Sequence, residues 1–528
     1  MDKTYFISQS TSLTLVITIS LIFTIVGLIY SKKYQGINNY LTANRNIGFF
    51  SLTTSLIASA LGAWILFGPA SAATWGGIGA VIGYALGTAF PMIFLISLGK
   101  KIRTDFPKGS TLIEFLRKRF GKSLFKLILL MTVFYMFVFL CAEVTAVAIL
   151  INYISGTELW VTSLIILIAT LAYTLYGGLR ASIFTDNIQM IVIVALLLIS
   201  VFYLTSFTGD QFSFSFIKEK SPHLLSASYI PNYTAGLTFF IAVAATNLFH
   251  QGNWQRVYAA KNNEVLKKSL IVAFIVIIPI VFFMGFSGLV AVSANPKVIP
   301  DLGFFSLLLS EQTEFLSLII VILGLSLTIS TVDTLVNAIS SLIVVDGKAT
   351  FNLNKKTNYL TLSKYFIVVL SIIAFVIASK GFSVLYLFLL ADLFCCAFVL
   401  TVFYSFYNKK LNEKTAYISI IIGLIGGFLL FPAPDFSKSL LVGIILPADT
   451  FPAFVSQSLL FLSFIIATFL PVIFWKIKGS KKIDLIICKR CISNYIHPNK
   501  CLRFKYPLIT YQKFMIMALK PLIMLALK

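Results

Sequence analysis

The stretch SLTISTVDTLVNAISS, residues 326–341, places polar residues inside a long apolar segment. The polar residues recur every three or four positions, which puts them on one face of a helix. They are Ser326, Ser330, Asp333, Thr334, Asn337 and Ser341. Hydroxyls and amides on such a face can simply hydrogen-bond to neighbouring helices, and this role suits Asn337 to Ser341 as well as a functional one. A carboxylate is costly to bury in a bilayer unless it is paired, so Asp333 is a candidate functional residue.

The composition identifies an integral membrane protein. Of the 528 residues, 58% are hydrophobic and 12% charged, whereas soluble domains carry about a quarter charged residues. The apolar runs are long and continuous, which favours helices of about 20 residues over alternating barrel strands. The net charge of +23 is concentrated in loops between apolar runs, as the positive-inside rule predicts. We therefore expect a lipid bilayer around the chain and no nucleic-acid partner.

Thirteen apolar ranges predict an all-α polytopic membrane protein with about 13 transmembrane helices. The ranges are 10–30, 50–74, 77–98, 124–152, 159–176, 183–206, 233–250, 269–293, 314–345, 364–379, 383–407, 414–431 and 454–475. If the N-terminus is outside, every inside loop is basic and the outside loops are poor in Lys and Arg. We therefore expect a cytoplasmic C-terminus, in a plasma membrane that is the inner membrane in a bacterium.

Glycine and proline interrupt the second range, in SALGAWILFGPASAATWGG at residues 59–77. Both residue types free backbone groups from the helical ladder, and a membrane tolerates this only where the groups are buried in protein or face a cavity. A proline kink is the simpler explanation. A broken helix at a binding site near the bilayer midplane is the functional one.

Ser330 and Thr331, next to Asp333, offer hydroxyl oxygens, and hard cations prefer oxygen ligands. A second acid, Asp186, lies in YTLYGGLRASIFTDNIQMIVIV at residues 173–194. From the pattern alone, Asp186 is best explained as a helix N-cap that interacts with the helix dipole.

Four stretches together resemble the sodium:solute symporter family. They are NYLTANRNIGFFSLTTSLIAS at 39–59, YTLYGGLRASIFTDNIQ at 173–189, NWQRVYAAKNNEVLKKS at 253–269 and SLTISTVDTLVNAISSLIVVD at 326–346. They occur in the family's order, and the resemblance covers roughly residues 10–475. It implies a five-plus-five inverted repeat around a broken helix, formed by spans 2–6 and 7–11 within a transmembrane domain at 1–482. Residues 483–528 are then a basic cytoplasmic tail, suited to anionic lipid.

The resemblance also implies cation sites. The positions that match the family's main sodium site are the carbonyls of Ala58, Leu61 and Leu327 and the side chains of Ser330 and Thr331. The positions that match a second sodium site, found in some members, are Asp186, Asp333 and Thr334. Asp333 stands where certain two-sodium members have serine. The number of sodium ions per transport cycle, one or two, therefore stays open. Several members have a polar residue at the position of Ala60. We therefore do not assign the sugar or the proline of those members to this chain as its solute.

Polar and aromatic residues of the neighbouring spans are candidates for contact with a solute. They are Trp64, Tyr135, Glu143, Asn247 and Asp392. Glu143 and Asp392 lie in apolar runs like Asp333, and a structural pairing suits each of them equally well.

The sequence thus predicts a secondary active transporter that couples inward sodium movement to uptake of a small polar solute. We expect sodium as the coupling ion and no organic cofactor. No nucleophile or metal constellation of an enzyme is found in the spans. Two alternatives are a transporter-like membrane sensor and a proton-coupled carrier of the same fold, and the hydroxyl pair of Ser330 and Thr331 favours sodium over protons.

Overall fold

The computed structural model describes residues 5–207, 209–310, 313–351, 358–407, 411–434, 436, 438–442 and 458–478. The tail predicted at 483–528 lies outside these residues. Ten helices in the described ranges are long and apolar enough to cross a membrane. They are α1 (Gln9–Lys33), α4 (Gly68–Asp105), α6 (Lys122–Ser155), α7 (Leu159–Phe207), α11 (Asn263–Ala294), α13 (Glu314–Leu342), α15 (Tyr359–Ala378), α16 (Val384–Tyr404), α17 (Glu413–Leu430) and α20 (Leu459–Lys478).

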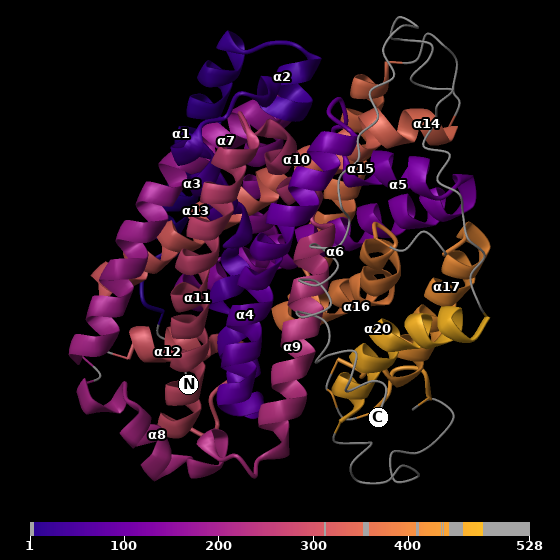
Figure 1. The fold of residues 1–528 in the computed structure, drawn as a ribbon. Helices are drawn as coiled ribbons and strands as arrows, with labels where there is room; N and C mark the ends of the chain where they lie inside the picture. The colour runs from indigo at the N-terminus through magenta and orange to yellow at the C-terminus, as the bar shows by residue number, and fades with distance from the viewer. Residues whose placement is uncertain are drawn as a thin grey trace, which may run out of the picture.

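The remaining described helices connect or extend these ten. They are α2 (Ile37–Thr42), η1 (Ala43–Arg45), α3 (Phe49–Ala60), η2 (Ala63–Leu66), α5 (Leu112–Arg119), η3 (Gly209–Gln211), α8 (Phe214–Lys220), η4 (Pro222–Leu225), α9 (Ile230–Phe249), α10 (Gln251–Ala259), η5 (Pro300–Leu302), α12 (Gly303–Leu308), η6 (Ile343–Gly347) and α14 (Lys348–Phe351). The fold is therefore all-helical, as predicted, and Figure 1 shows the long helices forming one bundle.

The count of 13 crossings is not confirmed, although helix is present in all thirteen predicted ranges. Two of the ten long helices, α4 and α7, each extend over residues of two neighbouring predicted ranges. Gly77 and Gly178 mark the joints, where each glycine has a φ of +61° that interrupts the helical geometry. Glycine adopts this left-handed conformation without the strain that a Cβ brings, so the chain turns sharply at both joints.

The predicted interruption of the second span is present. Helix α3 ends at Ala60, Leu61 and Gly62 leave the helical conformation, and α4 resumes after η2. A second break, which we did not predict, separates α9 from α10 at His250, where ψ is 106°. The two breaks fall in the first helices of the two expected repeats, spans 2 and 7.

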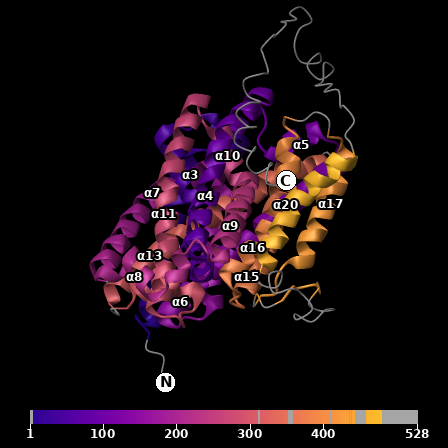
Figure 2. The same cartoon turned by 60° about the horizontal axis from the view of Figure 1, so that its bottom comes forward.

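Helix α13 lies at the centre of the bundle. Its most apolar window is 83% buried, against 28% for α1 and 22% for α15. It packs against α6 and α7, while α4 packs against α9 and α11. Helices α17 and α20 lie together at one edge in both views (Figures 1 and 2). The polar face of α13 is therefore enclosed by protein, and the apolar outer faces of α1 and α15 are suited to lipid.

Candidate functional site

Asp186 is the centre of a buried polar network. The hydroxyl of Ser55, on α3, donates to Asp186 Oδ2 over 2.5 Å, and the hydroxyl of Ser330, on α13, donates to Oδ1 over 2.6 Å. Arg256 Nη2 donates to Oδ2 over 2.7 Å, and both charged side chains are fully buried. Asp186 thus joins four elements of the bundle: α3, α7, α10 and α13.

The interpretation of Asp186 as a helix N-cap is wrong. The residue lies inside α7, eight positions after Gly178, where the second part of this helix begins. The polar residues around Asp186 suggested that a helix begins there. The second part of α7 in fact begins at the left-handed Gly178, eight residues earlier. The carboxylate therefore points at other elements and does not cap its own helix.

Arg256 completes the network and was missing from the predicted site. Its Nε donates to the carbonyl of Ser55 at 3.1 Å and to the hydroxyl of Ser55 at 2.7 Å. Its Nη1 donates to the carbonyl of Gly252 at 3.1 Å, and Nη2 also donates to Thr334 Oγ1 at 3.0 Å. A guanidinium whose donors are shared among a carboxylate and neutral oxygens is held in one orientation. The ion pair links α10, just after the second break, to α7.

Asp333 is held by hydroxyl groups alone among the described residues. Tyr173 OH donates to Oδ2 at 2.7 Å, Ser182 Oγ to Oδ1 at 2.7 Å, Thr185 Oγ1 to Oδ2 at 3.1 Å and Thr334 Oγ1 to Oδ1 at 3.4 Å. Because the Thr334 hydroxyl also accepts from Arg256, the two acids belong to one connected network. If both carboxylates are ionised, this network carries two negative charges and one positive charge.

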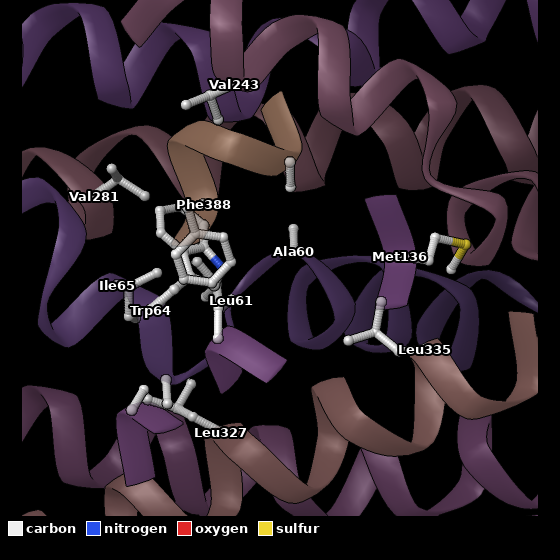
Figure 3. Packing of buried hydrophobic residues seen from close by; sticks show 14 of the residues in the cluster. Ala60, Leu61, Trp64, Ile65, Met136, Val243, Val281, Leu327, Leu335 and Phe388 are labelled. Atoms are coloured by element: carbon white, nitrogen blue, oxygen red, sulfur yellow. The ribbon is translucent and has the colours of Figure 1, made fainter. Parts of the chain in front are cut away.

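The residues expected at the main cation site lie on adjacent elements. Helix α13 packs against α3 and η2, and Leu61 and Leu327 belong to the same buried cluster (Figure 3). Thr331 Oγ1 donates to the carbonyl of Leu327 at 3.1 Å, and the carbonyl of Ala58 accepts the N–H of Leu61 at 3.3 Å. The structure thus packs α3 and η2, which lie on either side of the first break, against α13, and the Ser330 proton is directed at Asp186.

Two of the expected solute residues, Glu143 and Trp64, lie at the first break. Trp64 is part of η2, and Glu143 reaches the break from α6. Its Oε2 accepts the backbone N–H of Ala63 at 2.9 Å, and its Oε1 accepts that of Trp64 at 3.4 Å. The Trp64 ring stacks on Tyr84 with 5.6 Å between ring centroids. Figure 3 shows Trp64 beside Phe388, and their centroids are 6.2 Å apart.

The other expected solute residues divide into a pair and a residue bonded to its own helix. Asp392 accepts the hydroxyl of Thr246 at 2.5 Å, and Tyr135 OH donates to the carbonyl of Thr246 at 3.5 Å. The side chain of Asn247 donates to the carbonyl of Val243, one turn earlier in α9. Tyr135 and Asp392 therefore come together on α6 and α16, while Asn247 is engaged with its own helix.

Comparison with known proteins gives concordant matches. The model of the sodium:solute symporter family matches residues 40–423. A spermidine transporter of Candida albicans is 27% identical over 380 residues, which is 71% of each chain. The sodium/glucose cotransporter 1 of Mus musculus is 31% identical over 195 residues, 35% of this chain and 28% of that protein.

Two solved structures share the fold. A sodium-coupled sialic acid symporter in a substrate-bound outward-open state superposes with a TM-score of 0.68 and 17% identity, over 89% of this chain and 99% of the other. The nucleobase-cation-symport-1 family transporter MHP1 superposes with a TM-score of 0.53 and 12% identity, over 84% of this chain and 95% of the other.

Proposed function

The chain belongs to the sodium:solute symporter family, and we propose that it couples inward sodium movement to the uptake of a small polar solute. It is a transporter and not an enzyme. Its relatives are named for different solutes, among them spermidine, glucose and proline. The solute of this protein is therefore better sought in its own residues than in the name of a relative.

The observation that best supports sodium coupling is the position of the Ser330 hydroxyl. Its proton is directed at Asp186, so the oxygen lone pairs stay available to a cation. Helix α3, which includes Ala58, and η2, which follows Leu61 and Gly62, both pack against α13. Sodium held by the carbonyls of Ala58, Leu61 and Leu327 and by the hydroxyls of Ser330 and Thr331 would tie the broken helix to α13.

A sodium ion that bridges the broken helix and α13 would couple the movement of sodium to that of the solute. Sodium binding holds α3 against α13 and favours the outward-open state, in which the solute pocket beside the first break is complete. Solute binding then permits closure and inward opening, and sodium leaves into the low sodium concentration of the cytoplasm. Inward opening needs both ligands, because sodium completes the solute pocket at the break and only the bound solute then permits closure.

Asp186, Asp333 and Thr334 form a second or transient cation site in this proposal. The network has one uncompensated negative charge when both acids are ionised, because Arg256 neutralises only one of them. A second sodium would neutralise it. The proton-coupled carrier remains a second candidate on the same observation, since a proton on Asp333 would neutralise the network equally well.

The test is uptake of a radiolabelled solute panel by proteoliposomes with an imposed sodium gradient. Replacing Ser330 and Thr331 together by alanine should raise the sodium concentration needed for half-maximal uptake at least tenfold. Ser317→Ala is the matched control, because this buried hydroxyl of the same helix bonds to the carbonyl of Thr313 and to no other described residue. An unchanged sodium response in the double variant, or equal wild-type uptake in potassium with a proton gradient, would refute the proposal.

The orientation in a plasma membrane, with the N-terminus outside and the C-terminus cytoplasmic, is part of this proposal. It is supported by the basic loops between the helices. It places the chain so that uptake follows the inward sodium gradient.

A further inference from the structure

Glu143 is a fully buried carboxylate without a cationic partner among the described residues. The two backbone N–H groups of the first break use only part of its capacity, since a carboxylate offers about four acceptor positions. Gly62 makes this approach possible, because a Cβ at that position would collide with Glu143 Oε1. The carboxylate is thus held at the break, with acceptor capacity to spare.

Aromatic rings extend along the same wall. Tyr135, Phe139 and Glu143 follow one another at four-residue intervals and so share one face of α6. The Phe139 ring meets Phe388 of α16 edge to face, with 4.7 Å between centroids, and Phe388 also meets Trp64. Electron-rich ring faces attract organic cations, and the attraction grows when water is excluded.

A second buried carboxylate lies farther along this wall. Asp392 follows Phe388 by one helical turn on α16, is 5% exposed and receives a hydrogen bond from the Thr246 hydroxyl. It also has no cationic partner in the described part of the chain. Tyr135, which contacts the same Thr246 as Asp392, lies two helical turns from Glu143 on α6, so the Asp392 end of the wall is about 12 Å from Glu143. A short alkyl chain bridges such a distance.

The second break contributes an unpartnered polar side chain to the same wall. His250 is 2% exposed, and neither of its ring nitrogens has a hydrogen-bond partner. Its ring meets Phe139 edge to face at 5.9 Å. A buried polar group without a partner costs free energy, and a ligand N–H that donates to the imidazole would satisfy its acceptor nitrogen.

We propose that the solute is an aliphatic amine with a positively charged group at each end, held by Glu143 and Asp392 with its alkyl chain against Phe139, Phe388 and Trp64. This inference rests on the proposed transport function and names its solute class. An anion would be repelled by both carboxylates. A sugar would need more uncharged hydrogen-bonding side chains than this wall presents, and Asn247 is already bonded to its own helix.

The first measurement is binding to the purified full-length protein in detergent, with 1,4-diaminobutane as the probe in sodium buffer. Butylamine, glucose and proline serve as comparison ligands. Thermal stabilisation by the diamine should need at least tenfold less ligand than stabilisation by butylamine, and neither glucose nor proline should stabilise. Stabilisation by glucose or proline but not by the diamine would overturn the inference.

Glu143→Gln then separates recognition from a structural role, because the amide oxygen can still accept the N–H of Ala63. We expect the diamine concentration for half-maximal stabilisation to rise at least tenfold, the butylamine value to change less than threefold, and stabilisation by sodium alone to stay unchanged. Glu158→Gln, at an exposed position of the 156–158 loop, is the control and should change none of the three. An equal loss for diamine, butylamine and sodium would show that Glu143 only supports the break, and would overturn the inference.

Uptake of radiolabelled diaminobutane into proteoliposomes distinguishes this inference from the function on which it rests. Uptake that needs a sodium gradient supports both. Diamine binding with uptake indifferent to sodium contradicts the proposed coupling and leaves the solute class standing. Sodium-driven uptake of glucose or proline without diamine binding contradicts the solute class and leaves the coupling standing.

Discussion

The ion pair between Asp186 and Arg256 should behave as a single unit. In Asp186→Asn, the guanidinium keeps its neutral partners Ser55, Gly252 and Thr334 but loses its counter-charge. In Arg256→Gln, Asp186 keeps two hydroxyl donors and no positive partner. Breaking a buried pair from one side leaves an uncompensated charge and costs about 3 to 5 kcal/mol, so we expect losses of this size in both variants.

The double variant Asp186→Asn/Arg256→Gln should lose much less than the sum. It buries two neutral amides in place of two charges, and each hydrogen bond left unmade costs about 1 to 3 kcal/mol. A total loss of about 2 to 4 kcal/mol is therefore expected, with a coupling energy of several kcal/mol in the double-mutant cycle.

Reversible unfolding of the purified variants in mixed detergent micelles measures these losses as differences in the free energy of unfolding. Asp105→Asn is the matched control. It breaks an exposed i,i+4 pair with Lys101, and exposed pairs contribute about 0 to 1 kcal/mol. Additive losses in the double variant, or single losses as small as that of the control, would refute the description of this pair as a buried unit.

Three further predictions concern the second cation site, the joint in α7 and the topology. Asp333→Asn should lower sodium-driven uptake at least tenfold. Thermal unfolding should still show stabilisation by sodium, which binds through Ser330 and Thr331. Uptake at the wild-type level would exclude Asp333 from the mechanism. Gly178→Ala should lower the free energy of unfolding more than Gly209→Ala does. Both glycines have positive φ, but only at Gly178 would a Cβ meet the backbone of Tyr40. Equal free energies of unfolding in the two variants would contradict this close approach. An impermeant thiol reagent should label single cysteines placed in 207–232 from outside intact cells, but in 99–123 only after permeabilisation; the reverse pattern would overturn the orientation.

The helices were largely predictable because membrane segments must be long and apolar. What the apolar runs could not show is how neighbouring segments join. Gly77 and Gly178 are ordinary glycines in the sequence, and only the structure shows their left-handed φ. The break at His250 was missed for a similar reason, since no proline marks it and the polar residues around it were assigned to a cytoplasmic loop.

A member of the buried polar network was predictable where a single residue conflicts with its surroundings, as Asp333 does in an apolar helix. Arg256 was not found, because a basic residue in a loop is already explained by the positive-inside rule. The loop assigned around it in fact begins with α10, which is buried along its whole length. The family resemblance of its segment, WQRVYAAK, was the available signal, but the partner Asp186 is 70 positions away in the sequence.

The excess negative charge of the Asp186–Arg256–Asp333 network bears on how membrane voltage would act on the transport cycle. With both acids ionised, this network would carry one net negative charge across the membrane field when the empty site turns from the inside to the outside. A bound sodium at the second site cancels this charge. An interior-negative potential, which is worth about 2.3 kcal/mol per elementary charge and 100 mV, would favour the return of the empty site to the outside. Because the sodium at the main site adds one positive charge, the same potential would also favour the loaded inward step. Voltage would therefore act on both halves of the cycle, through the carboxylates of the network when the site is empty and through the main-site sodium when it is loaded.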